Sequence, residues 1–217
     1  MERWARAKYQ PVLPLGEDGH RVTGSREHIE LSKDAAKEGM VLLKNQGNVL
    51  PLARGSRVAL FGKATFDYVK GGGGSGDVTV AYTRNLYEGL KKKADHVEIF
   101  EELADFYREN VKGQYAQGRG PGMTVEPVLP EELLQKARAF TDTAIISICR
   151  FSGEGWDRKS VYDRKGKADD TVIAGQEQKQ DDEEEVFEEG DFYLTHGEKA
   201  MVEAVKKYAG VDFDAVA

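Results

Sequence analysis

Arg57-Val58-Ala59-Leu60-Phe61-Gly62 is the stretch that decides the fold, because four consecutive apolar residues end at a glycine. A continuous apolar run of this length predicts a strand that is covered on both faces. Residues 97–100 and 143–149 have the same character. Helical patterns precede, separate and follow these segments, at residues 26–45, 83–94, 101–116, 131–140 and 192–208. This alternation predicts an α/β domain with a mostly parallel sheet and helices on both faces.

The two ends of the chain differ from this alternating centre. Residues 1–25 are rich in proline, glycine and charge, so we expect an N-terminal arm outside the core. Residues 213–217 have the pattern of a strand that has only begun. We therefore expect one domain over residues 26–217 whose sheet is truncated at the C-terminus, and we interpret the chain as a fragment.

Residues 159–191 differ from the rest of the domain in composition. They contain few apolar residues, and eight acidic residues gather within 181–191. A charge run of this kind is typical of a solvated segment, because it offers little apolar surface to bury. We expect a flexible acidic loop at 159–191.

Charge and hydropathy exclude several classes of protein. The 217 residues include 31 basic and 38 acidic ones, and the formal charge of −7 argues against nucleic acid as the main partner. No apolar run is long enough for a membrane span, and no secretory signal is visible after Met1. The single cysteine, Cys149, fits a reducing compartment and a buried position in its strand. These features predict a soluble, cytoplasmic protein.

A glycine-rich stretch, Gly71-Gly72-Gly73-Gly74-Ser75-Gly76-Asp77, follows the first expected strand. It contains the GxGxxG pattern of dinucleotide-binding loops, but nine residues separate it from the strand, whereas that fingerprint needs the turn at the strand end. No Gly-Lys-Ser/Thr sequence completes a phosphate-binding loop, and the four histidines lack metal-ligand spacing. The residues alone leave a flexible loop and a ligand-contacting loop equally open.

A second motif, Arg150-Phe151-Ser152-Gly153-Glu154-Gly155-Trp156-Asp157-Arg158, directly follows the expected strand at 143–149. Open α/β sheets bind ligands at the carboxyl ends of their strands, where this motif begins. An aromatic wall such as Trp156 would raise the pKa of the Glu154 carboxyl, whereas contact with Arg150 or Arg158 would lower it. A general acid and an ordinary loop glutamate in a salt-bridge cluster both fit this pattern.

Several stretches, in the same order along the chain, resemble glycoside hydrolase family 3, and most closely its β-glucosidase branch. The sequence AAKEGMVLLKN at 35–45, followed by VLPL at 49–52, is similar to the opening of that family's second domain. The motifs at 71–77 and 150–158 are similar to its later motifs, as is DFYLT at 191–195 with Glu198-Lys199 after it. The resemblance covers roughly residues 28–217, which is nearly the whole expected domain.

The resemblance implies a three-layer α/β/α sandwich that packs against a TIM-like barrel. It also implies retaining hydrolysis of terminal β-linked glucosyl residues by two carboxyl groups about 5–5.5 Å apart. In this family the barrel supplies the aspartate nucleophile, and the position that matches Glu154 supplies the general acid/base. Gly73, Gly74 and Ser75 match a loop at the mouth of the active site, and Trp156 matches a wall on the aglycone side. A β-glucoside or oligosaccharide substrate and the barrel of the same parent protein are the implied partners, with no metal and no organic cofactor.

Two features of the chain depart from the family pattern. The 217 residues hold no barrel and hence no nucleophile motif, so we expect half an active site and an inactive isolated chain. The segment between Arg158 and Asp191 is also longer and more acidic than the pattern of the family. Because Met1 precedes the domain, a parent protein with reversed domain order fits the sequence. A noncatalytic sugar-binding or interaction module on the same sandwich is the alternative, and a dinucleotide-binding domain is a weaker third.

Overall fold

The computed structural model describes residues 15–17, 19, 22, 24–71, 78, 80, 82–152 and 186–209. The chain forms two compact units, one made of Met1–Pro51 with Thr79–Tyr82 and the other of Leu52–Val78 with Thr83–Ala217. The strand expected at 213–217 lies outside the described residues, as does most of the acidic segment at 159–191.

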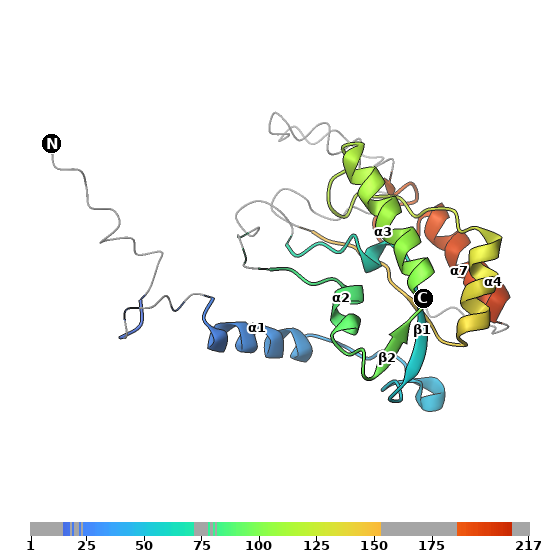
Figure 1. The fold of residues 1–217 in the computed structure, drawn as a ribbon. Coiled ribbons are helices and arrows are strands. Elements are labelled where there is room, and N and C mark those ends of the chain that lie inside the picture. Colours follow the sequence, from blue (N-terminus) through green and yellow to red (C-terminus); the bar gives the residue numbers. More distant parts are fainter. Residues whose placement is uncertain are drawn as a thin grey trace. The chain divides into compact units, whose positions relative to one another are not determined.

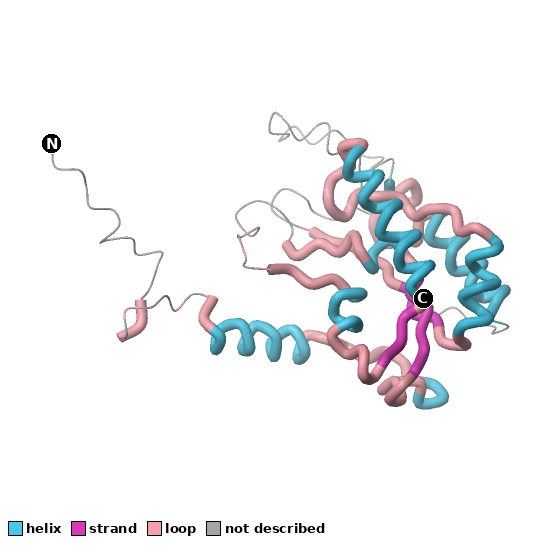
Figure 2. Tube along the Cα trace, viewed as in Figure 1, coloured by secondary structure: helices cyan, strands magenta, loops and turns pink. Residues whose placement is uncertain are grey.

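The second unit is built on a parallel sheet in which β1 (Ser56–Phe61) is the central strand. β2 (Val97–Ile99) pairs with the first half of β1, and β3 (Ala144–Ile146) pairs with its second half. Figure 2 shows these strands side by side in magenta. The parallel α/β sheet predicted from the sequence is confirmed, although β3 is shorter than the strand expected at 143–149.

Helices follow the strands in the predicted order (Figure 1). They are α2 (Leu86–Lys91), α3 (Glu101–Ala116), α4 (Glu131–Phe140) and α7 (His196–Ala209). A 3-10 turn that was not predicted, η2 (Lys63–Thr65), directly follows β1. The bounds of α3 and α4 agree with the prediction. α2 begins late because Asn85 forms a capping box with Glu88 at its first turn.

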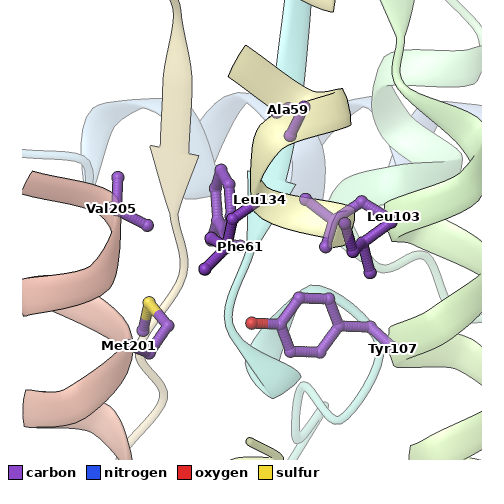
Figure 3. Close-up of a cluster of buried hydrophobic side chains, with 9 residues drawn as sticks. Ala59, Phe61, Leu103, Tyr107, Leu134, Met201 and Val205 are labelled. Atoms are coloured by element: carbon purple, nitrogen blue, oxygen red, sulfur yellow. The ribbon is translucent and has the colours of Figure 1, made fainter. Parts of the chain in front are cut away.

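Successive side chains of β1 enter two separate hydrophobic clusters, because alternate residues of a strand point to opposite faces. Val58 and Leu60 pack with β2 and with the apolar side chains of α2. Ala59 and Phe61 pack on the opposite face, against α3, α4 and α7, as Figure 3 shows. Helices therefore cover both faces of the sheet, as predicted. The buried helical residues of the second cluster are Leu103, Tyr107, Leu133, Leu134, Ala137, Met201 and Val205.

The first unit contains α1 (Arg26–Glu38) and the 3-10 turn η1 (Gln46–Asn48). Ser25 caps α1 by accepting from the His28 N–H, but the prediction of a helix to residue 45 was wrong. The helix ends at Gly39, and the residues that follow, 40–43, are all apolar and consecutive. A helix would point such a run in all directions rather than onto one face, so the pattern does not favour helix there.

Two further features concern the apolar residues of the described part of the chain. No helix in the described part of the chain is long and apolar enough to cross a membrane. Cys149 is buried, which confirms its expected role as a small apolar side chain after β3.

Candidate functional site

Both sequence motifs leave the sheet from the carboxyl ends of neighbouring strands. The glycine-rich stretch follows β1 through residues 62–71, and the Glu154 motif follows β3 through residues 147–152. The predicted site residues themselves lie outside the described residues, namely Gly73, Gly74, Ser75, Glu154 and Trp156. The structure describes the residues that connect each motif to its strand, and we call residues 62–71 and 147–152 the two stems.

The two stems touch where they leave the sheet. Gly62 has a φ of +94°, and a Cβ built on it would lie 2.2 Å from the Ser147 carbonyl oxygen. Only glycine fits so close a backbone approach without a shift. The Ser147 N–H donates to the Phe61 carbonyl at 2.9 Å, and the Thr65 and Ser147 hydroxyls lie 3.4 Å apart. The stems of both motifs are therefore in direct backbone contact where they leave the sheet.

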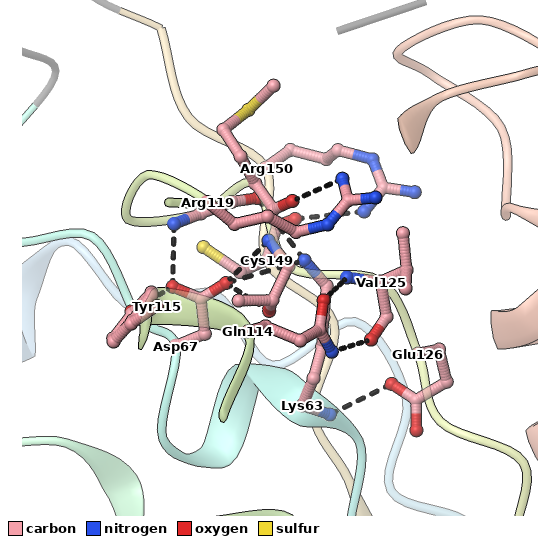
Figure 4. A network of polar contacts seen from close by, with 12 residues as sticks. Lys63, Asp67, Gln114, Tyr115, Arg119, Val125, Glu126, Cys149 and Arg150 are labelled. Carbon is pink, nitrogen blue, oxygen red and sulfur yellow. Dashed lines mark hydrogen bonds and ion pairs between the residues drawn. The ribbon is translucent and has the colours of Figure 1, made fainter. Parts of the chain in front are cut away.

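A buried ion pair holds the stem of the glycine-rich stretch. The Lys63 ammonium lies 3.5 Å from the Asp67 carboxylate and donates to the Gly122 carbonyl at 3.2 Å. Asp67 accepts from the Gly122 N–H at 2.6 Å, the Thr124 N–H at 3.2 Å, and the Thr124 and Tyr115 hydroxyls. Figure 4 shows this network at the end of α3. Four residues before Gly71, the chain is thus fixed to the segment that follows α3.

Glu126 anchors the same stem from the other side. Its carboxylate accepts from the Lys63 N–H at 2.8 Å and from the Tyr107 hydroxyl at 2.7 Å. Burial raises the pKa of Glu126 above its ordinary value, although both donors favour the charged form. Burial likewise lowers the pKa of Lys63, against the attraction of Asp67.

Arg150 holds the stem of the Glu154 motif. Its guanidinium forms a bidentate pair with Glu198, at 2.8 and 2.6 Å. Its remaining N–H groups donate to the carbonyls of Cys149, Asp191 and Tyr193, at 2.8–3.0 Å. All five donors of the guanidinium are thus used.

Glu198 joins this ion pair to the first turn of α7. The Thr195 N–H donates to the Glu198 carboxylate at 2.9 Å, and the Glu198 N–H donates to the Thr195 hydroxyl at 3.1 Å. This reciprocal capping box fixes the start of the helix and explains why α7 begins at residue 196 rather than 192. Burial raises the pKa of Glu198, but the Arg150 and Thr195 hydrogen bonds outweigh it, so the pKa lies below its ordinary value.

Sequence reasoning missed the groups that carry these stems. Lys63, Asp67 and Glu126 were not predicted as site residues, because the sequence does not show whether a charged residue is buried or exposed. A faint signal was present for Glu198, since Thr195 and Glu198 have the spacing of a capping box. Among the described residues, no group of three or more histidine, cysteine or carboxylate side chains is placed to hold a metal ion.

Comparisons of the chain with known proteins identify its family. A family model described as the glycosyl hydrolase family 3 C-terminal domain matches residues 40–210. The chain belongs to glycosyl hydrolase family 3. Membership of glycosyl hydrolase family 3 confirms the resemblance on which the α/β sandwich and the assignment of the motifs were based.

Individual relatives within glycosyl hydrolase family 3 agree in sequence and in fold. The chain is 58% identical over 208 residues to β-glucosidase A of Butyrivibrio fibrisolvens, covering 95% of this chain and 24% of that protein. A structure of β-glucosidase 3B from Thermotoga neapolitana in complex with α-D-glucose is 30% identical, with a TM-score of 0.61, and matches 85% of this chain and 22% of that one. A β-glucosidase structure from Paenibacillus barengoltzii is 27% identical, with a TM-score of 0.65, and matches 90% of this chain and 18% of that one. The chain thus spans about a quarter or less of these relatives' length.

Proposed function

We propose that this chain is the acid/base-bearing part of a retaining β-glucosidase that hydrolyses terminal β-D-glucosyl residues. The observation that carries the proposal is 58% identity over 95% of the chain to a β-glucosidase. Glu154 is the general acid/base, Gly73, Gly74 and Ser75 contact the sugar, and Trp156 forms a wall of the leaving-group side. A TIM-like barrel of the same parent protein supplies the aspartate nucleophile.

The described stems support this assignment of roles. In open α/β sheets ligands bind beyond the carboxyl ends of the strands, and both loops leave from those ends of β1 and β3. Since the stems touch at Gly62 and Ser147, the sugar-contacting loop and the acid/base loop start beside each other. A glycoside between them meets the acid on its leaving oxygen while the barrel nucleophile approaches the anomeric carbon from the other face.

The reaction then divides into two steps. First, the Glu154 carboxyl protonates the glycosidic oxygen as the nucleophile bonds to the anomeric carbon, and the aglycone leaves as an alcohol. Second, the Glu154 carboxylate takes a proton from water, whose oxygen displaces the nucleophile and releases β-glucose.

The proposed setting of the protein is a reducing one, the cytoplasm, because the sequence has a single cysteine.

The test uses the full-length protein with Glu154→Ala. General acid catalysis contributes typically about 10²–10⁴-fold, and it matters most for a poor leaving group. Cleavage of cellobiose should therefore slow far more than formation of the glycosyl-enzyme from 2,4-dinitrophenyl β-glucoside. Azide, which needs no base, should accelerate turnover of the dinitrophenyl substrate and yield β-glucosyl azide.

Glu132→Ala is the matched control, because this exposed glutamate on α4 pairs only with the surface Lys136 among the described residues. It should leave both substrates unaffected. Equal losses on the two substrates for Glu154→Ala, with no azide product, would refute the acid/base assignment. Unchanged hydrolysis would favour the noncatalytic sugar-binding module instead.

A further inference from the structure

The Arg150–Glu198 ion pair takes no part in the proposed reaction, yet it lies next to the loop that carries it. We propose that Arg150, held by Glu198, is the positioning residue for the Glu154 acid/base. This inference rests on the proposed function of Glu154. The pair fixes the backbone from which Glu154 extends, so that its carboxyl meets the glycosidic oxygen rather than sampling many positions.

The contacts of Arg150 join the two sides of the segment between Ser152 and Val186. Arg150 precedes that segment, whereas Asp191, Tyr193 and Glu198, which accept its hydrogen bonds, follow it. Its guanidinium also lies over the Phe187 ring, 4.7 Å from the centroid. One side chain therefore contacts residues on both sides of that segment in the sequence. The pair is largely shielded from solvent, since the side chain of Glu198 is 2% exposed and that of Arg150 is 20% exposed.

The residue after Arg150 is fixed as well. Phe151 packs against a buried apolar cluster of Met123, Val186 and Phe187. A Cβ built on Gly122 would lie 2.4 Å from the Phe151 ring, so the ring occupies space that only a glycine leaves free. Glu154 lies two residues beyond Ser152, and a chain of two residues reaches at most about 7 Å. The acid is thus tethered closely to an anchored stretch of backbone.

The chemistry of the contacts requires arginine at this position. A guanidinium presents five donors in a fixed plane, whereas an ammonium has three donors and no plane. Lysine at residue 150 would keep the charge but could not bind both oxygens of Glu198 and the three carbonyls together. The Arg150→Lys variant therefore separates the role of charge from that of geometry.

The kinetic consequence differs from that of a loss of stability. If Arg150 positions the acid, its replacement should mimic the loss of acid catalysis, because misplacement by about 1 Å can cost on the order of 10²-fold. Cleavage that needs proton donation should slow, whereas cleavage of an activated aryl glucoside should not. A merely destabilised enzyme loses both activities together, in proportion to the folded fraction.

The experiment uses the full-length protein and compares Arg150→Met, Arg150→Lys, Glu198→Gln and the Arg150→Met/Glu198→Gln double variant. The readout is the ratio of kcat/KM for cellobiose to kcat/KM for 2,4-dinitrophenyl β-glucoside, which cancels the concentration of folded enzyme. We expect Arg150→Met to lower this ratio by roughly 10- to 100-fold, and Arg150→Lys to lower it less. Glu198→Gln should lower it in the same direction, and the double variant should be no worse than Arg150→Met, since both residues act as one unit.

Two control variants separate positioning from stability. Arg138→Met removes an arginine whose exposed partner is Asp142, and it should change neither activity. Leu134→Ala truncates a buried core residue and should lower stability while leaving the ratio unchanged. Melting temperatures of all variants show whether the stability losses are comparable. If Arg150→Met does not fold, the ratios of Arg150→Lys and Glu198→Gln are compared with that of the wild type instead.

Glu154→Ala, measured in parallel, separates the two proposals. If Glu154→Ala lowers the ratio and the variants of Arg150 and Glu198 leave it unchanged, the positioning role is overturned and the proposed function stands. If Glu154→Ala itself leaves the ratio unchanged, the proposed function fails and the positioning role fails with it. A lowered ratio in Leu134→Ala would also overturn the inference, because it would show that the ratio responds to stability alone.

Discussion

The Lys63 ammonium lies 3.5 Å from the Asp67 carboxylate, and both side chains are almost completely shielded from solvent, at 4% and 0% exposed. The partners of the two residues differ in number. Asp67 accepts several further hydrogen bonds, from Gly122, Thr124 and Tyr115, whereas the Lys63 ammonium has one further partner among the described residues, the Gly122 carbonyl. The carboxylate is therefore the group on which this part of the fold depends.

Asp67→Ala should destabilise the protein more than Lys63→Met. Removal of the carboxylate leaves an ammonium buried beside unsatisfied donors, and breaking a buried pair in this way costs about 3–5 kcal/mol. Lys63→Met leaves a carboxylate that still accepts from Gly122 and Thr124, so its cost should be smaller. Urea unfolding measures both, and a larger cost for Lys63→Met would contradict the assignment of Asp67 as the centre of the network.

Glu126→Gln and Glu198→Gln should change the pH dependence of stability in opposite directions. The folded-state pKa of Glu126 is raised above 4.5, so wild type loses stability from this group as pH rises above that value toward the folded pKa. The folded-state pKa of Glu198 is lowered, so its contribution is present above 4.5 and lost as pH falls below it.

The destabilisation by Glu126→Gln should therefore diminish from pH 4.5 upward, and that by Glu198→Gln should diminish from pH 4.5 downward. The free energy of unfolding, measured from pH 3 to pH 8, checks both slopes. Parallel pH profiles for the two variants would show that the burial of Glu126 does not govern its titration.

Gly62→Ala should be much more destabilising than Gly55→Ala. Both glycines have positive φ, at +94° and +79°, which costs an alanine about 1–3 kcal/mol in backbone strain. At Gly55 nothing lies within 4 Å of the added Cβ, whereas at Gly62 the Ser147 carbonyl oxygen lies 2.2 Å from it. The difference in free energy of unfolding thus isolates the contact between the two stems, and equal costs would mean that the stems can separate freely.

The 217-residue chain alone should not hydrolyse p-nitrophenyl β-glucoside. A retaining mechanism needs two carboxyl groups, and the proposal places only Glu154 within these residues. The assay uses purified chain, with full-length protein as the positive control. Turnover that disappears in Glu154→Gln would contradict the proposal that the nucleophile resides on a separate domain.

The sequence predicted those helices whose apolar residues recur at regular spacing along the chain. α3 and α4 were predicted with the bounds they have, because their apolar residues recur with helical spacing. The helix expected at 26–45 was too long, because the apolar residues beyond Gly39 extended the apparent pattern. Apolar residues at helical spacing predict that a helix is present. They do not show at which residue the helix ends when further apolar residues follow it.

The candidate site could be predicted only in part, for a physical reason. The motif around Glu154 was placed at the carboxyl end of a strand, and its stem at Ser147 and Arg150 lies there. The partners of Arg150 could not be predicted, since Glu198 lies 48 residues away and nothing in the sequence specifies that distance in space. The network of Lys63 and Glu126 joins positions 63 residues apart and was missed for the same reason.

The ion pair between Arg150 and Glu198 also bears on how this part of the chain can change among relatives. Arg150 follows β3 and Glu198 lies in α7, so the pair secures the backbone on both sides of residues 153–185 in the sequence. Given the proposed roles of Glu154 and Trp156, the other positions between these two anchors are therefore the ones where substitutions and changes of length should cost the sheet least.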